Sequence, residues 1–189
     1  SLVGSEMCIR EGYIGEDCNK IIYQLRYFLF TPGFQYIYFF RKAAAASTFT
    51  RLFWLIGLRF CMFKTGIQIP YTTKIGPGFR IVHFGSIVIN PQTIIGKNFN
   101  IAQGALIGNS AGKNKGVPII GDNVCINANA IVIGGVKIGN NVLIAPGAFV
   151  NFDVPDNSIV IGNPGKIIVR EQSPVSYTHL RAHETPEHL

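Results

Sequence analysis

The chain has 189 residues, of which 48% are hydrophobic, and this length suits one globular unit with a leading subdomain. Its formal net charge is +7, from 17 Lys and Arg against 10 Asp and Glu. Cys18, Cys61 and Cys125 show no CxxC or other paired spacing, which indicates reduced, structural thiols and favours a cytoplasmic protein. The longest apolar stretch, from Leu52 to Phe63, is interrupted by Arg59 and is shorter than the ~20 residues of a spanning helix.

The two ends of the chain carry neither an apolar repeat nor an amphipathic pattern. Residues 1–10 and 174–184 resemble translated sequencing-adapter segments, so we expect them to be foreign to the fold and to pack poorly. With residues 1–10 and everything from residue 174 onward set aside, His83 is the only histidine. The expected organisation is an adapter-derived segment (1–10), a helical subdomain (11–66), a repeat domain (67–169) and a tail (170–189) that is adapter-derived from about residue 174.

The segment before residue 67 is rich in aromatic side chains and predicts three helices, over residues 20–30, 34–46 and 48–63. The first helix is separated from the second by the helix-breaking residues Thr31, Pro32 and Gly33. The third helix is capped by Ser47 or Thr48. Two interpretations of the aromatic side chains stay open. They pack against the following domain or a neighbouring subunit, or they form a peripheral contact with anionic lipid at the inner face of the membrane.

Basic residues are concentrated in the first two thirds of the chain. Between Cys18 and Gly121 there are twelve Lys and Arg and no Asp or Glu. This excess indicates an anionic partner, such as a nucleotide with several phosphates, a nucleic acid or a bilayer surface. The sequence has no reader helix, aromatic RNA-binding motif or zinc-ligand set, so we expect neither a nucleic-acid partner nor a metal.

From Ile120 to Pro155 the sequence repeats every six residues. A six-residue unit cannot bury its own apolar face, so such repeats must stack on one another. Gly and Asn follow the aliphatic positions, and both tolerate the left-handed backbone of a tight corner. The first places of the hexads are Ile120, Ile126, Val132, Ile138, Ile144 and Val150, and the fifth places are Val124, Ala130, Val136, Val142, Ala148 and Val154.

The period extends upstream with two interruptions. Two extra residues intervene around His83, and residues 108–118 replace a regular hexad. Three hexads make one triangular coil, so the pattern predicts a mainly β fold, a parallel β-helix preceded by a short α-helical subdomain. Departures from a regular repeat form loops that leave the core, which is where we expect the chemistry.

Three segments carry a family resemblance: residues 78–91 around His83, the broken loop 107–112 with the following 118–124, and residues 160–166. Together they resemble the left-handed β-helix acyltransferases of the hexapeptide-repeat type. Within these, they are similar to serine O-acetyltransferases and to related enzymes found with surface-polysaccharide genes. The resemblance implies a left-handed coil, acetyl transfer from acetyl-CoA to a hydroxyl, and a homotrimer with active sites between subunits.

The same resemblance implies that His83 is the catalytic base. A neutral imidazole, with an ordinary pKa of about 6.5, can take the proton of a hydroxyl as its oxygen attacks a thioester carbonyl. The alternative is a histidine held at a corner for structural reasons. Six further residues are expected to bind acetyl-CoA, three along the pantetheine arm, two at small corner positions and one on the phosphates: Gly108, Asn109, Ser110, Ala128, Pro146 and Lys166.

Three positions depart from the serine enzymes. Gln68 stands where those enzymes place an Asp that orients the imidazole, Val82 where an acid precedes the His, and Val117 where a second His is expected. Gln68 Oε1 or a backbone carbonyl is left to fix the His83 tautomer. Because charged groups that engage serine are missing, we predict a sugar hydroxyl of a surface-polysaccharide precursor as the acceptor, free or lipid-linked, near Gln68 and Val117. Serine O-acetylation for cysteine biosynthesis is one alternative, and a catalytically weak solenoid scaffold is another.

Overall fold

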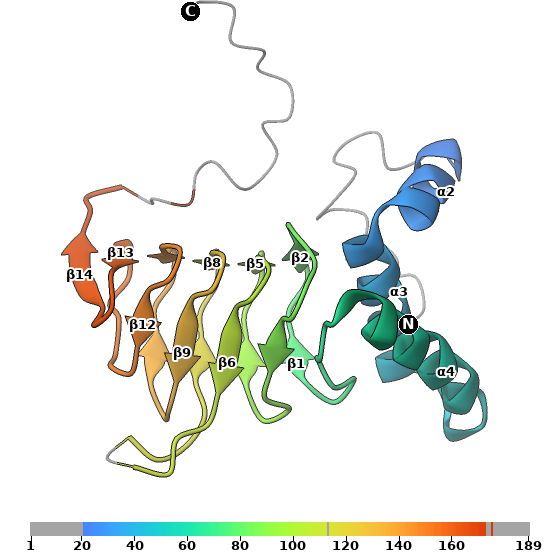
Figure 1. Cartoon of the computed structure of the whole chain (residues 1–189), viewed down its shortest axis with the longest axis horizontal. Coiled ribbons are helices and arrows are strands. Elements are labelled where there is room, and N and C mark those ends of the chain that lie inside the picture. Colours follow the sequence, from blue (N-terminus) through green and yellow to red (C-terminus); the bar gives the residue numbers. More distant parts are fainter. Residues whose placement is uncertain (1–20, 113, 173–174, 176–189) are drawn as a thin grey trace, which may run out of the picture.

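The computed structural model describes residues 21–112, 114–172 and 175. Figure 1 shows a row of stacked coils with three helices packed at its N-terminal end and the last strand at the opposite end. The coils contribute their strands to three separate sheets, as in the predicted parallel β-helix. Apart from Val175, the terminal segments that we compared with adapter sequence lie outside the described residues.

The helical subdomain follows the predicted pattern to within two residues at each described helix end. Pro32 occupies the first turn of its helix, where the missing N–H costs no hydrogen bond. Gly66 ends the last helix with φ +72°, and its N–H donates to the Met62 carbonyl at 2.8 Å. The helices are α2 (Ile21–Phe30), α3 (Pro32–Ala45) and α4 (Thr48–Thr65).

The strands are short, and each pairs with the strand one coil away. They are β1 (Lys74–Ile75), β2 (Arg80–Ile81), β3 (Val88–Ile89), β4 (Ile94–Ile95), β5 (Asn100–Ile101), β6 (Leu106–Gly108), β7 (Ile119–Ile120), β8 (Cys125–Ile126), β9 (Ile131–Ile133), β10 (Lys137–Ile138), β11 (Leu143–Ile144), β12 (Phe149–Val150), β13 (Ser158–Ile161) and β14 (Lys166–Val169). Three sheets result, which we name after their first strands: the β1 sheet (β1-β4-β7-β10), the β2 sheet (β14-β13-β11-β8-β5-β2) and the β3 sheet (β12-β9-β6-β3). All pairs are parallel except β13 with β14.

The core lies inside the coils and is built from the predicted repeat positions. All twelve first and fifth places of the hexads between Ile120 and Val154 are at most 3% exposed, which confirms their inward orientation. The upstream residues Ile69, Ile81 and Ile101 are at most 1% exposed and continue the same core. Burying one such aliphatic side chain contributes about 1.5–3 kcal/mol, so the period itself supplies the main stabilisation of the solenoid.

The corner between the β1 and β2 sheets is a ladder of asparagines. Asn98, Asn123, Asn141 and Asn157 have φ between 54° and 56°, the left-handed backbone that Asn tolerates well. Each side-chain amide donates to the next one along the corner, at 2.9 Å from Asn98 to Asn123 and at 3.0 Å in the two following steps. The Gly-x-Asn pattern of the sequence therefore marks this corner, as predicted.

Two side chains of α3 fix the helical subdomain to the first coil. The hydroxyl of Tyr36, which is fully buried, donates to the Ile69 carbonyl at 3.0 Å and accepts from the Ile69 N–H at 2.9 Å. Arg41 donates to the carbonyls of Ile75 and Gly76, each at 2.5 Å. These contacts hold α3 on the open end of the coil, with α4 packed beside α3.

Candidate functional site

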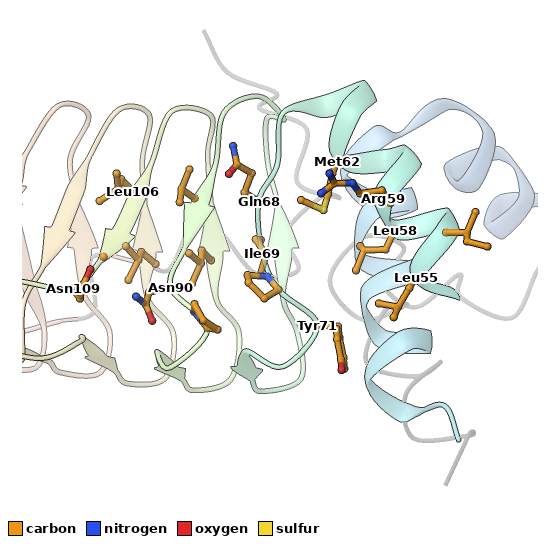
Figure 2. Close-up of a pocket in the computed structure, with 17 residues that line it drawn as sticks. Leu55, Leu58, Arg59, Met62, Gln68, Ile69, Tyr71, Asn90, Leu106 and Asn109 are labelled. Carbon is orange, nitrogen blue, oxygen red and sulfur yellow. The ribbon is translucent and has the colours of Figure 1, made fainter. Parts of the chain in front are cut away.

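A pocket of about 1000 Å³ lies between α4 and the outer face of the β3 sheet. Its lining is mostly apolar, and it contains three residues that the sequence predicted for the site, namely Gln68, Gly108 and Asn109. Gln68 belongs to the first coil, where it forms a bridge with Val88 and leaves its side chain exposed. Figure 2 shows both Asn109 and Gln68 on the solenoid side of the pocket, with Gln68 on the coil nearer to α4.

The helical wall of this pocket was not predicted. Leu55, Leu58, Arg59 and Met62 come from α4 at helical spacing, and they face the coils across the cavity (Figure 2). Arg59 is the one cation in the lining, and its guanidinium lies 4.7 Å from the centre of the Phe63 ring. The spacing of these residues in the sequence was a usable signal, because positions three and four apart share one helix face.

His83 lies at a different place, on the corner between the β2 and β3 sheets. Its side chain is exposed, and among the described residues none forms a hydrogen bond with its ring. Within the described part of the chain, the His83 ring donates neither to Gln68 Oε1 nor to a backbone carbonyl, the acceptors that we expected to fix its tautomer. The two extra residues that the sequence shows around His83 form a turn that ends at Ser86, with φ 46°.

The turn of His83 begins a line of stacked turns that we call the His83 edge. The Gly104 N–H donates to Gly85 O at 2.9 Å, the Asn129 N–H to Gln103 O at 3.0 Å, and the Gly147 N–H to Ala128 O at 2.9 Å. The residues that follow one another along this edge are His83, Gln103, Ala128 and Pro146. Ala128 and Pro146, predicted for the cofactor groove, are therefore on the same edge as His83.

The C-terminal turn closes the same edge. The Phe149 N–H donates to Gly162 O, and the Gly165 N–H donates to Phe149 O, both at 3.0 Å. Lys166 follows directly, is exposed, and begins β14, which turns back along β13. Four steps of about 4.8 Å separate the level of His83 from this turn, so the edge is roughly 19 Å long.

The second interruption of the repeat is a loop on the corner between the β3 and β1 sheets. Ser110 and Gly116 exchange backbone hydrogen bonds at 3.0 and 3.1 Å at its base. The loop leans over the following coils, because Asn114 O accepts from the Gly135 N–H at 2.9 Å and its side chain donates to Asn151 O. Val117 leaves the loop half-buried just before β7, outside the pocket lining.

The predicted site residues therefore fall into two groups within one chain. Gln68, Gly108 and Asn109 share the pocket on the β3 sheet, whereas His83, with Ala128 and Pro146, lies along the edge at the other side of that sheet. Gln103 was missed, although it occupies the same corner one coil after His83. Its Oε1 atom is buried and has no hydrogen-bond partner within the described part of the chain.

In residues 21–112, 114–172 and 175 no group of three or more His, Cys, Asp or Glu side chains is arranged to hold a metal ion. None of the helices in that part is long and apolar enough to cross a membrane. Cys61 and Cys125 are buried free thiols, and burial raises the pKa of Cys125 to about 11.

The chain is similar to known proteins in sequence and in fold. A family model described as bacterial transferase hexapeptide (six repeats) matches residues 118–151. The serine acetyltransferase of Staphylococcus aureus is 41% identical over 123 residues, which cover 64% of this chain and 57% of that protein. The serine acetyltransferase of Bacillus licheniformis is 39% identical over 110 residues, covering 57% of this chain and 50% of that protein.

Among solved structures, the serine acetyltransferase of Neisseria gonorrhoeae in complex with serine matches with a TM-score of 0.71 and 28% identity, covering 88% of this chain and 70% of that one. These similarities confirm the predicted left-handed parallel β-helix with N-terminal helices. The chain spans between 50% and 57% of the length of the two curated relatives named above. The relatives named above are serine acetyltransferases, and they give no support to the predicted surface-polysaccharide subgroup.

Proposed function

We propose that this protein is an acetyl-CoA-dependent O-acetyltransferase that transfers an acetyl group to the hydroxyl of serine. The observation that supports this best is an exposed imidazole, His83, at one end of a continuous edge whose other end carries the exposed amine of Lys166. A thioester substrate has its reacting carbon at one end and its phosphates at the other. The edge therefore offers a base and a cation at the two ends that such a molecule requires.

In the proposed reaction His83 is the general base. Its imidazole takes the proton of the serine hydroxyl while the hydroxyl oxygen attacks the thioester carbonyl. The new C–O bond forms, the C–S bond breaks, and the proton on the imidazole is returned to the departing sulfur. An exposed ring without a hydrogen bond to any described residue can meet both the hydroxyl and the sulfur.

The His83 edge is the proposed path of the cofactor. Ala128 and Pro146 are small corner residues, so they leave room for an extended chain to lie along the stacked turns. Lys166 is placed to neutralise phosphate charge at the far end, as a point charge on a flexible stem. The length of the edge, roughly 19 Å, is sufficient for an extended pantetheine-like arm.

The residues proposed for the thioester lie on the other side of the β3 sheet. Gly108, Asn109 and Ser110 can stabilise the oxygen of the tetrahedral intermediate only if their corner meets the His83 edge. Within one chain the width of the sheet separates them. We therefore propose a homotrimer in which the His83 edge of one subunit faces the Gly108 corner of its neighbour, so that each active site lies between two subunits.

Serine is favoured by the relatives, and a sugar hydroxyl remains the second candidate acceptor. The observation that favours the sugar is chemical, because Gln68, Val82 and Val117 offer no charge to the ammonium or the carboxylate of serine. Gln68 lies exposed in a largely apolar pocket, and Val82 is 40% exposed beside His83. A site without charged groups suits a neutral polyol that is bound by amide and backbone hydrogen bonds.

The experiment is thiol release from acetyl-CoA, with serine compared with nucleotide-sugars and lipid-linked sugars. We expect turnover with serine, and we expect His83→Ala to lower it ~10²–10⁴-fold while acetyl-CoA binding, measured by calorimetry, is retained. Lys137→Ala, an exposed change on the β1 sheet, serves as the matched control and should keep full turnover. Unchanged turnover in His83→Ala would show that His83 is not the general base. Turnover with sugars but not with serine would show that the acceptor is a sugar.

A further inference from the structure

One face of α4 is apolar, and its side chains are exposed along the length of the helix. Phe49, Phe53, Ile56, Phe60 and Phe63 follow one another at intervals of four, three, four and three residues, so they lie on one side of the helix. Together with Leu52 these side chains form the α4 stripe, and each is 64–98% exposed. Scattered exposed apolar residues are ordinary, but a contiguous stripe of four Phe, one Leu and one Ile marks an interaction surface.

Cations flank the α4 stripe on both sides. Arg59 is exposed and its guanidinium stacks on Phe63 of the stripe, 4.7 Å from the ring centre. Lys64 is exposed on the other side, where its amine donates to Gln35 Oε1 at 3.1 Å. The three described helices contain six Lys and Arg and no Asp or Glu. A partner that covers the stripe must therefore be compatible with a surface on which all the charged side chains of these helices are positive.

We propose that the α4 stripe is a docking surface for an anionic lipid bilayer. The aromatic side chains would enter the boundary between headgroups and acyl chains, and the flanking Arg59 and Lys64 would remain at the level of the lipid phosphates. Each basic residue held near an anionic leaflet contributes to binding, so the absence of acids in α2, α3 and α4 favours such a surface. The helix would lie in the plane of the surface and would not cross it.

The position of α4 in the molecule suits this mode of binding. Figure 1 shows α4 at the helical end of the molecule, beyond the first coil, and the residues of the α4 stripe are exposed there. A protein partner would more often present acidic residues and a concave groove to such a helix, whereas a bilayer needs only the apolar stripe and the cations. Ile56 belongs both to the stripe and to the pocket lining, so a docked bilayer would adjoin the mouth of the pocket.

The test uses the full chain and two vesicle preparations, one of phosphatidylcholine alone and one of phosphatidylcholine with phosphatidylglycerol in equal parts. Trp54 is the single tryptophan, it lies on α4, and its ring is 5.1 Å from that of Phe53 in the stripe. We expect co-sedimentation with the anionic vesicles, accompanied by a blue shift of Trp54 fluorescence. The binding should weaken as salt is raised, because it depends on screened charges.

Two pairs of substitutions separate the apolar and the charged contributions. Phe49→Ser with Phe60→Ser should weaken binding to the anionic vesicles about tenfold, because two exposed rings no longer enter the bilayer. Arg59→Gln with Lys64→Gln should weaken it about tenfold as well. Ile119→Ser, which changes a 47% exposed residue on β7, is the matched control and should bind like the wild type.

Three outcomes would overturn the proposal. The first is no binding to anionic vesicles, and the second is binding that the phenylalanine pair leaves unchanged. The third is a self-association in solution, detected by light scattering, that the phenylalanine pair dissolves while vesicle binding is absent. That third result would make the α4 stripe an interface between copies of this chain. Circular dichroism of each variant checks that the exposed substitutions leave the fold intact.

Discussion

Tyr36→Phe tests how the helical subdomain is held on the solenoid. The substitution removes one oxygen atom from a fully buried side chain and leaves the ring in place. That oxygen serves both the N–H and the carbonyl of Ile69, at 2.9 and 3.0 Å, and Ile69 lines the pocket next to Gln68. The change therefore leaves two buried backbone groups without their partner, at the seam between α3 and the first coil.

The expected loss in free energy of unfolding follows from these two backbone groups. A buried donor or acceptor left without a partner costs about 1–3 kcal/mol, so the free energy of unfolding should fall by about 2–6 kcal/mol at neutral pH. Contacts in a solenoid are local, and we therefore expect the helices to detach before the coils unfold. The detachment should also disturb the pocket, because its helical wall is formed by α4, which packs on α3.

The assay is urea unfolding followed by two signals. Trp54 fluorescence reports the helical subdomain, and circular dichroism at a strand wavelength reports the coils. In Tyr36→Phe the fluorescence transition should move to lower urea than the dichroism transition. Tyr38→Phe is the matched control, because among the described residues the Tyr38 hydroxyl makes no hydrogen bond while its ring packs 5.3 Å from that of Phe28. It should change stability by less than about 0.5 kcal/mol.

The pH dependence of stability tests the role of the Tyr36 hydroxyl independently. Burial raises the pKa of Tyr36 to about 12 from an ordinary value of 10.0, although its hydrogen bond with Ile69 acts in the opposite direction. A pKa raised in the folded state favours the neutral form there, so this stabilisation is complete below pH 10 and is lost as the pH rises through 12. The difference in unfolding free energy between wild type and Tyr36→Phe should therefore narrow above pH 10, by about 3 kcal/mol over the two pH units. Coincident unfolding transitions in both proteins, with no difference at any pH, would refute this account of the seam.

Two further predictions concern the solenoid itself. Asn123→Ala should lower the free energy of unfolding in urea by about 2–4 kcal/mol, because it breaks two ladder hydrogen bonds and places Ala at φ 56°. Asn123→Gly should lower it by about 1 kcal/mol less, since Gly adopts this backbone without strain. Equal losses in the two variants would show that the left-handed corner carries no strain. Burial raises the pKa of Cys125 from 9.0 to about 11, so the wild type should lose stability relative to Cys125→Ala as the pH rises from 9 to 11. If the free energies of unfolding of the two proteins change in parallel over this range, the prediction is wrong.

The solenoid was predictable because its core is periodic in the sequence. Each inward position recurs after six residues, so a residue such as Ile126 or Val142 can be assigned from the period alone, and both are fully buried. The corners were predictable for a related reason, since Gly and Asn mark the left-handed backbone at Asn123 and Asn141. The first two helices were separated at the breaker Thr31-Pro32-Gly33, and the third was placed after its expected cap at Ser47 or Thr48.

The pocket was not predictable in the same way. Its position depends on how α4 sits against the β3 sheet, and that arrangement is set by single contacts such as those of Tyr36 and Arg41 with the first coil. A single contact of this kind has no period and leaves no pattern in the sequence. The helix face of Leu55 and Met62 was visible as a spacing, but the element that it faces was not.

The separation of the site residues within one chain has a physical cause in the repeat. In a triangular coil the inward positions are fixed by packing, so chemistry is confined to the corners and to the outer faces. A residue at a corner is followed, one coil later, by another residue at the same corner, so that a corner becomes a line, as it does from His83 through Gln103 to Ala128. Residues on two different corners of a rigid prism cannot converge by bending the prism, because its stacked hydrogen bonds resist this. A base on one corner and amide donors on another can therefore act on the same thioester only across a contact between two chains, which is why the proposed activity requires an oligomer.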